Sequence, residues 1–441
     1  MKNKSLTFVT ILLLFVMVVS ACAPKSIQQP QEEPAQPAEA EESAEEVESI
    51  TLEYWVFSDY AQGDAGDLQK TFIAEFEAEH PGVTINISGK GDDELNTGLV
   101  TSATSNTLPD LFMNSTSNGA KFVKVNAVDN VYDRWMEMSE DFRSQFNPTM
   151  IAEVSQSEGT MYGMPYTGYA TFLYRNLTVL GEAGIDPDVE IADWDAWLAQ
   201  MEQISDAGFV ALPSFSYDWW DFVSIYSGAG TADEWGIDFD NNVTKINPEK
   251  FAQAAQFLVD AKPFGTELGI GDQGATDLFI TNQLAYTVSG PWANPTFLEA
   301  KETNGLDYDY VVIPGATADN KGGIRGTEYI GFAPNGHIDL AWEFAMYICD
   351  EPQMTRWTEL LARYNSNEVS LSKVSDPLLE ITTEGAKSAL FERPPHFVEA
   401  YPGDYLQILT DNLAAIELGD VTSDEGAANL IEELNAVIAA E

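Results

Sequence analysis

Segments with strand character and segments with helix character alternate along the first part of the chain, and this alternation constrains the fold more than any other feature. Residues 50–57 (ITLEYWVF) and 83–87 are rich in β-branched and aromatic residues, as buried strands are. The segment between them carries apolar residues at helical spacing, and residues 95–103 predict another helix before a strand at 108–113. Such alternation is typical of a mostly parallel α/β sheet.

The chain is long enough and apolar enough for two large hydrophobic cores, and its length suggests two domains. It has 441 residues, of which 44% are hydrophobic. Further helices are predicted at residues 193–204, 248–259, 340–349 and 427–440. Cys349 is the only cysteine beyond the N-terminal segment, so we expect no internal disulfide and a fold that depends on its cores.

The N-terminus has the organisation of a secretion signal. Lys2 and Lys4 give it a positive start, and the apolar run of residues 6–19 is shorter than the roughly 20 residues that a membrane-spanning helix needs. Small residues then lead directly into Cys22, which resembles the bacterial lipobox, whose cysteine is acylated and becomes the mature N-terminus. We therefore expect a lipoprotein with its lipid on Cys22; the alternative is an ordinary secretory signal with an incidental cysteine.

The segment that follows the cysteine has the composition of a linker. Residues 23–49 contain four prolines, eight glutamates, one lysine and no aromatic residue. Such a stretch cannot bury enough apolar surface to offset the entropy of ordering it. We expect it to be a disordered spacer between a membrane anchor and a folded part.

The charge and the missing motifs exclude several classes of function. The formal net charge is −50, and removing Lys2 and Lys4 with the signal makes it −52. A surface this acidic repels phosphate backbones, so we expect no nucleic-acid partner. The three histidines have no companions at metal-ligand spacing, and no phosphate-binding glycine loop or nucleophile elbow occurs. We expect neither a metal nor a cofactor.

Several stretches, taken in their order, resemble the extracellular solute-binding proteins of ABC importers, specifically the sugar-binding, maltose-binding-protein-like family. The most specific is residues 159–187 (GTMYGMPYTGYATFLYRNLTVLGEAGIDP), although Arg175-Asn176 stands where that family has a Tyr-Asn pair. The other stretches are FEAEHPGVTINI (76–87), LPDLF (108–112), WDAWLAQMEQI (194–204), VSGPWA (288–293), YDYVVIPGA (308–316) and AWEFAMYICDEPQMTRW (341–357). Together they cover nearly all of residues 50–440.

The resemblance implies a two-lobed α/β fold, with a mostly parallel sheet flanked by helices in each lobe, a hinge of crossovers and a ligand cleft between the lobes. The expected parts are a signal peptide (1–22), a linker (23–49), a first lobe (50–167 and 310–334) and a second lobe (168–309 and 335–441).

The resemblance also implies a function. The protein is expected to capture a mono- or oligosaccharide without any catalytic activity, and to deliver it to ABC transporter permease subunits. It would be a monomer, lipid-anchored at the cell surface or in the periplasm. Two alternatives remain: the same fold binding a polyamine, amino acid or peptide, or a secreted glycoside hydrolase, which needs two carboxylates about 5–10 Å apart across its cleft.

Aromatic side chains are the first candidates for a sugar site, because a sugar presents flat C–H faces and a rim of hydroxyl groups. Trp292 follows the turn formed by Gly290 and Pro291, and in the resembled family this position often stacks on a sugar ring; the alternative is packing in the hinge. In the cluster YDWW (217–220), at least one of Trp219 and Trp220 is expected to supply the opposing wall of the site; the alternative for one of them is a position facing the core.

The remaining candidates follow predicted strands or lie at the crossovers and the final cleft loop that the resemblance implies: Ser58, Asp59, Asn114, Ser115, Tyr166, Glu328, Tyr329, Arg363 and Tyr364. For Asp59 a helix cap is the alternative role. For Arg363 it is a surface ion pair, and Tyr166 could equally be a hinge residue.

Overall fold

The predicted alternation of strands and helices is confirmed at the start of the fold. The elements are β1 (Ile50–Phe57), α1 (Gly63–Glu79), β2 (Val83–Lys90), α2 (Asp92–Ser105) and β3 (Leu111–Ser115). Strand β1 pairs in parallel with both β2 and β3. Helix α1 buries its apolar face, as its helical spacing predicted.

The computed structural model describes residues 49–155, 159–214, 219–231, 234–238, 240–267, 270–391 and 404–440. The predicted signal, Cys22 and all but the last residue of the predicted linker lie outside the described residues, as do Tyr217 and Asp218. The described residues belong to one unit, Val47–Glu441.

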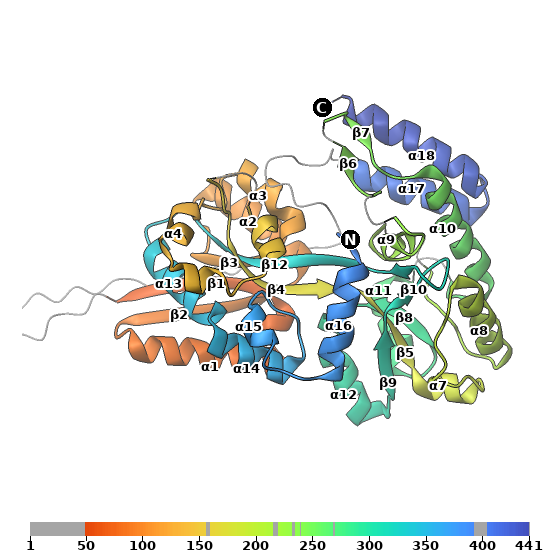
Figure 1. Ribbon diagram of the computed structural model, residues 1–441, viewed down its shortest axis with the longest axis horizontal. Helices are drawn as coiled ribbons and strands as arrows, with labels where there is room; N and C mark the ends of the chain where they lie inside the picture. The colour runs from red at the N-terminus through yellow and green to blue at the C-terminus, as the bar shows by residue number, and fades with distance from the viewer. Residues whose placement is uncertain are drawn as a thin grey trace, which may run out of the picture. The chain divides into compact units, whose positions relative to one another are not determined.

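The first sheet has the strand order β13-β12-β3-β1-β2, and β4 (Met164–Ala170) also pairs with β12 (Ile324–Phe332). Strand β12 is antiparallel to β3 and β4, and parallel to the short β13 (Leu390–Phe391). The two long partners β4 and β12 lie side by side in the centre of Figure 1. One end of β12 contributes Phe332 to the first core and the other end contributes Ile324 to the second core, so this strand connects the two lobes.

The boundary expected for the second lobe is wrong for residues 335–361. Helices α13 (Ile338–Cys349) and α14 (Glu351–Leu361) pack in the core of the first lobe, not the second. The reason is aromatic packing, since Phe344 of α13 contacts Tyr54 and Phe76 with ring centroids 5.9 and 5.2 Å apart. This pairing joins the first and last thirds of the chain.

The second sheet has the order β8-β5-β9, with β5 (Phe172–Asn176), β8 (Tyr286–Ser289) and β9 (Tyr308–Val311). Both pairings of β5 are antiparallel, so the expected mostly parallel character is wrong here, although the two-lobed α/β class is confirmed. Strands β8 and β9 run in the same direction and are joined through helix α12 (Asn294–Asn304), and β5 is inserted between them. The assignment of residues 310 and 311 to the first lobe is also wrong, because they belong to β9 of the second sheet.

Helices cover both faces of the second sheet. The larger core is closed by α8 (Trp194–Asp206), α10 (Pro248–Ala261), α17 (Tyr405–Leu418) and α18 (Ser423–Ile438). Figure 1 shows α10, α17 and α18 packed together. A smaller core on the other face includes residues of α11 (Gly271–Ile280) and α12.

The predicted starts of two of these helices are confirmed. The Asp193 side chain accepts a hydrogen bond from the Ala196 N–H at 2.9 Å, and Asn247 caps α10, which begins at Pro248.

The remaining elements are short, apart from α16. They are η1 (Ser58–Tyr60), η2 (Thr116–Asn118), α3 (Gly119–Lys124), α4 (Tyr132–Glu137), α5 (Glu140–Arg143), α6 (Pro148–Glu153), α7 (Leu177–Glu182), α9 (Trp219–Ser227), β6 (Ile237–Asp238), β7 (Val243–Thr244), η3 (Lys262–Phe264), η4 (Pro291–Ala293), β10 (Ile313–Pro314), β11 (Lys321–Gly322), α15 (Glu368–Leu371) and α16 (Pro377–Ser388). Among the described residues, none of the helices has the length and apolar character needed to cross a membrane.

Candidate functional site

A cavity of about 1090 Å³ is lined by residues of both lobes, and we call it the main cavity. Its first-lobe side is formed where β1, β2 and β3 end, and its second-lobe side by α9 and η4. The lining residues are Phe57, Ser58, Asp59, Lys90, Gly91, Asp92, Asp93, Glu94, Ser115, Ser117, Asn118, Tyr169, Trp219, Trp220, Trp292 and Glu328. A position at the carboxyl ends of strands is where ligands bind in open α/β sheets.

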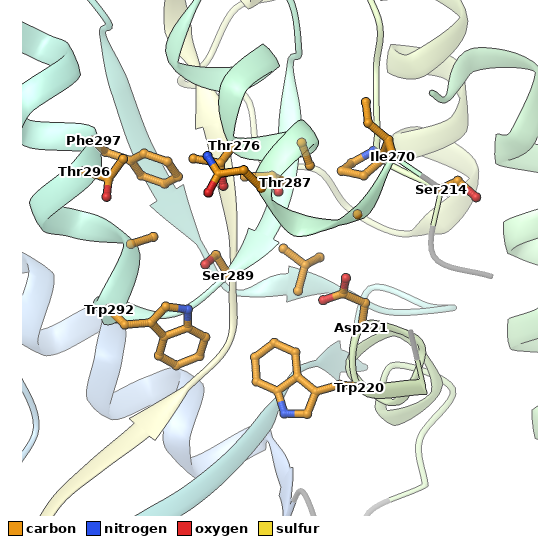
Figure 2. Close-up of a pocket in the computed structure, with 16 residues that line it drawn as sticks. Ser214, Trp220, Asp221, Ile270, Thr276, Thr287, Ser289, Trp292, Thr296 and Phe297 are labelled. Atoms are coloured by element: carbon orange, nitrogen blue, oxygen red, sulfur yellow. The ribbon is translucent and has the colours of Figure 1, made fainter. Parts of the chain in front are cut away.

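A second cavity, of about 690 Å³, lies in the second lobe, and we call it the side cavity. It shares Trp220 and Trp292 with the main cavity, so the two cavities meet at this pair of indole rings. Figure 2 shows the two rings at one end of the side cavity and Thr276 and Thr287 at the other.

Trp292 is held in place by its own turn and by two aromatic neighbours. A Cβ atom on Gly290 would lie 2.1 Å from the Trp292 ring, so only glycine lets the ring fold back over the turn. The ring centroid lies 5.5 Å from that of Trp220 and 5.8 Å from that of Tyr169. Because the indole is only half-buried between them, it presents apolar surface to both cavities.

Polar groups from strand ends face this aromatic wall. Ser58 and Asp59 follow β1, as the sequence predicted, and Ser115 is the last residue of β3, which extends beyond the predicted strand end at residue 113. The Ser115 hydroxyl lies 2.9 Å from the Ser117 hydroxyl and 3.2 Å from that of Tyr169. Hydroxyls and carboxylates of this kind can exchange hydrogen bonds with a polyhydroxylated ligand.

Arg363 lies beneath the main cavity and does not line it. Its guanidinium donates to Asp59 Oδ2 at 2.9 Å and to the Pro291 carbonyl at 3.4 Å, and it lies over the Tyr60 ring. Burial alone lowers the pKa of Arg363, but Tyr60, Asp59 and Glu328 raise it above its usual value, so the group stays charged. The alternative considered for Arg363, an ion pair with an acid, is confirmed, but its location at the surface is wrong: the Arg363 side chain is 9% exposed and that of Asp59 is 21% exposed.

Glu328 is the second carboxyl group at the floor of the main cavity. It accepts a hydrogen bond from Thr167 at 2.5 Å and another from Tyr60. Burial, and then the neighbouring Asp59 carboxylate, raise the pKa of Glu328 above its usual value. A carboxyl group with a raised pKa keeps its proton to higher pH and can then donate as well as accept.

The structure brings seven of the predicted site residues together at the main cavity: Ser58, Asp59, Ser115, Trp219, Trp220, Trp292 and Glu328. The others lie elsewhere. Asn114 and Tyr329 are fully buried, Asn114 bonding to Asn96 and Tyr329 packing in the first core. Adjacent residues of a strand point to opposite faces, so neither of these could join its neighbour at the cavity.

Tyr166 and Tyr364 also lie away from the main cavity. Tyr166 is fully buried, and its hydroxyl accepts from Gln69 at 3.0 Å, which makes it a core residue of the first lobe. Tyr364 lines another cavity, of about 420 Å³, together with Glu153 and Arg325.

Sequence reasoning missed Tyr169 and the first turn of α2. Lys90 ends β2 and is followed by Gly91, Asp92, Asp93 and Glu94, which all line the main cavity. For β1 and β3 the prediction used the rule that polar residues at the end of a strand face the ligand cleft. The same rule applies to the end of β2 and was the signal in the sequence that could have identified these residues. Phe57, Ser117 and Asn118 are further lining residues that were not predicted. Among the described residues no cluster of histidine, cysteine and carboxylate groups could hold a metal.

The fold and the interlobe cavity define a two-lobed α/β binding protein. Residues 62–354 match the family of bacterial extracellular solute-binding proteins, and the chain belongs to this family. Relatives from Brucella abortus and Brucella suis, named as binding proteins, are 30% identical over 133 residues, which is 30% of this chain and 31% of each relative.

Solved structures of sugar-binding proteins share the fold at low identity. The GacH receptor of Streptomyces glaucescens, described with acarbose, superposes with a TM-score of 0.75 at 20% identity, over 89% of this chain and 99% of that one. A solute-binding protein of Thermotoga lettingae bound to α-D-tagatose gives 0.74 at 19% identity, over 88% and 100%. The maltotriose-binding protein of Thermus thermophilus gives 0.71 at 14% identity, over 88% and 100%.

Proposed function

We propose that this chain is the substrate-binding component of an ABC importer, which captures a carbohydrate in the main cavity and delivers it to permease subunits without catalysing a reaction. The observation that carries the proposal is the facing arrangement of three tryptophans and strand-end polar groups across a cavity between two lobes. Indole rings cover the C–H faces of a sugar, while hydroxyls and carboxylates bind its rim. The solved structures of similar fold that carry sugars support the same ligand class.

Thermal-shift screening against a carbohydrate library tests this proposal. A ligand at about 100 times its Kd stabilises the folded state by roughly 2.7 kcal/mol. Trp220→Ala is the matched variant, since it should weaken the shift given by any sugar that the wild type binds. A library without a single stabilising carbohydrate would contradict the proposal.

A cationic solute is the second candidate, because the main cavity is lined by more acidic than basic side chains. Asp59, Asp92, Asp93, Glu94 and Glu328 line it, and Lys90 is the only basic residue among the described lining residues. Aromatic rings also bind cations. Polyamines and amino sugars therefore belong in the same screen, and stabilisation by them alone would favour this candidate.

A glycoside hydrolase is disfavoured by how the two carboxyl groups at the cavity floor are engaged. Asp59 is paired with Arg363, and Glu328 accepts hydrogen bonds from Tyr60 and Thr167. No new reducing ends should appear when the protein is incubated with glycans that it binds.

The lipoprotein signal is part of the proposal, and its test is cellular location. Cys22→Ala should move the protein from the membrane fraction to the soluble fraction, because it removes the only predicted acylation site. Cys349→Ala is the control, since that thiol is fully buried and its loss should leave the protein on the membrane. Equal membrane binding of the Cys22→Ala variant and the parent would contradict the anchor.

Ligand binding should bring the lobes closer together. The main cavity has walls on both lobes, so a ligand that contacts both walls favours a closed arrangement. Small-angle scattering should show a smaller radius of gyration with a saturating ligand from the screen, and no change with a sugar that gives no thermal shift. A profile that saturating ligand leaves unaltered would be evidence against closure.

A further inference from the structure

We propose that the cavity of about 420 Å³ lined by Glu153, Arg325 and Tyr364, which we call the rear cavity, binds a free amino acid that opposes the capture of sugar in the main cavity. The effect on sugar rests on the proposed function, whereas the amino-acid site itself does not. The proposal assigns a ligand and a regulatory role to a cavity that is separate from the sugar site.

The main cavity and the rear cavity lie on opposite faces of β4 and β12, the strands that connect the lobes. On β12, Thr327 lines the rear cavity and the next residue, Glu328, lines the main cavity. On β4, Gly168 lines the rear cavity, while Thr167 donates a hydrogen bond to Glu328. Successive residues of a strand point to opposite faces. Figure 1 shows α2 and α9, which line the main cavity, on one side of these strands, and α15, which lines the rear cavity, on the other.

The loop after α14 repeats this arrangement. Tyr364 lines the rear cavity, and a Cβ atom on Gly168 would lie 2.7 Å from its ring, so the ring packs directly against β4. The preceding residue, Arg363, donates instead to Asp59, which lines the main cavity. Tyr169 lines both cavities. Groups of the two cavities are therefore neighbours along the chain, which gives a short physical route for coupling between them.

The rear cavity has an acidic wall and a basic wall, and the two walls belong to different lobes. Glu153 of α6 and Glu368 of α15 form the acidic wall, next to the first core, which includes Val154 and residues of α14. Arg325, near the second-lobe end of β12, and Lys387 of α16 form the basic wall, and α16 packs against the smaller core of the second lobe. These four are the charged residues of its described lining.

The two walls complement a molecule that carries both an ammonium group and a carboxylate group. Carboxylates bind ammonium ions, and arginine and lysine bind carboxylates through charge-assisted hydrogen bonds. The ammonium group would lie toward α6 and α15, and the carboxylate group toward Arg325 and Lys387. A free amino acid has these two groups on one carbon atom, and its side chain would occupy the rest of the cavity.

Glu153 is the group that gains most from such a ligand. It is 4% exposed and accepts a hydrogen bond from the Thr327 hydroxyl at 2.5 Å. Burial raises the pKa of Glu153, Thr327 and Arg325 lower it, and the resulting value is about 7. These two neighbours therefore offset only part of the cost of burying the charge. An ammonium group beside Glu153 would offset more of it and favour the carboxylate form.

Hydrogen-bonding groups between the two walls fit the same ligand. The Tyr364 hydroxyl accepts from the Asn147 amide at 3.0 Å, and this amide also donates to Glu368 at 3.1 Å. Burial raises the pKa of the Tyr364 hydroxyl, Glu368 raises it further and Arg325 lowers it, so the hydroxyl lies near charges of both walls. Ligand pockets measure about 300–1000 Å³. A cavity of about 420 Å³ is therefore at the small end of the range and suits one amino acid.

The motion of the hinge sets the sign of the effect on sugar binding. Closure moves the two walls of the main cavity together, and walls on the opposite face of the hinge strands then move apart. A ligand that contacts both walls of the rear cavity favours the opposite, open arrangement. Amino acid and sugar should therefore weaken each other's binding, and linkage requires the same factor in both directions.

Calorimetry with each of the protein amino acids tests the site. We expect at least one to bind, and we expect its amide and its N-acetyl derivative, which each lack one charge, to bind at least about tenfold more weakly. Glu153→Gln and Lys387→Met should each weaken the amino acid by about tenfold for the same reason. Lys301→Met is the matched control, because this exposed lysine of α12 does not line the cavity, and it should change nothing.

The effect on sugar is measured by titrating a sugar from the thermal-shift screen with and without a saturating amount of that amino acid. We expect the apparent Kd of the sugar to rise by about fivefold or more, and saturating sugar to raise the Kd of the amino acid by the same factor. Unchanged sugar affinity would overturn the inference. Binding of the amino acid that survives Glu153→Gln and Lys387→Met but is lost in Trp292→Ala would also overturn it, because the amino acid then occupies the main cavity.

The same measurements distinguish failure of this inference from failure of the proposed function. If carbohydrates bind and no amino acid does, the inference is overturned while the proposed function stands. If an amino acid binds through Glu153 and Lys387 but no carbohydrate of the library binds, the proposed function fails and the effect on sugar fails with it.

Discussion

Replacing Trp292 by alanine should weaken sugar binding by about thirtyfold or more while the protein stays folded. Loss of a well-packed aromatic anchor commonly costs at least about 2 kcal/mol, out of roughly −8 kcal/mol for a ligand of micromolar affinity. The structure adds a reason for a large effect, because the ring is fixed by contacts with Gly290, Trp220 and Tyr169 and so has little conformational freedom to lose on binding. Calorimetry with a sugar from the screen measures the change.

Trp292→Phe and circular dichroism are the controls for this result. Phenylalanine keeps an apolar ring at the junction of the two cavities, so it should retain much of the affinity. Unchanged spectra show that a loss of binding is not a loss of fold. Binding of the alanine variant at wild-type affinity would show that Trp292 packs in the hinge and contributes nothing to the ligand.

Replacing Arg363 by methionine should lower the free energy of unfolding by about 3 kcal/mol. Methionine keeps an apolar stem but removes the partner of Asp59, whose carboxylate lines the main cavity, and breaking a largely buried ion pair in this way is costly. Urea unfolding followed by tryptophan fluorescence measures the loss. The double variant Asp59→Asn/Arg363→Met should recover part of it, because the uncompensated charge is then absent.

Arg356→Met is the matched control for this prediction. Arg356 also forms an ion pair, with Glu75 at 2.7 Å, and also lies over an aromatic ring, that of Phe72. Its side chain is 39% exposed, however, and exposed pairs contribute about 1 kcal/mol or less. Equal losses in the two single variants would show that burial of the Arg363 pair has no special energetic role.

The class of fold could be predicted because hydrophobic periodicity records local structure. The strands and helices from β1 to β3 occur in the predicted order, although β2 and β3 end later than predicted, and Asp193 and Pro248 mark helix starts as expected. The distribution of the later segments between the lobes could not be predicted in the same way. Helix α13 is apolar enough to pack in either core. Its place in the first core follows from its ring contacts with Tyr54 and Phe76, which are distant in sequence.

Ten of the twelve candidate site residues were predicted as five pairs of neighbouring residues, and the outcome for each pair depended on local geometry. Both members of a pair can reach the cavity when they lie beyond a strand end or on a helix, as Ser58 and Asp59 or Trp219 and Trp220 do. Within a strand only one can, because side chains alternate. The sequence alone did not show that Asn114 and Tyr329 would take the buried positions, since polar and aromatic residues occur on either face.

The long-range pairing of the first sheet has a consequence for the order in which the chain can fold. The edge of β3 away from β1 is occupied by β12, with Met113 opposite Ile330, and the core behind it is completed by α13 and α14. During synthesis from the N-terminus, the β3 edge of the first sheet therefore stays unpaired until β12 has been made, which is after most of the chain. Closure of so long a loop is slow. The nascent protein thus stays incompletely folded for longer than a chain with contiguous lobes, and an incompletely folded chain is the form that can be threaded across a membrane.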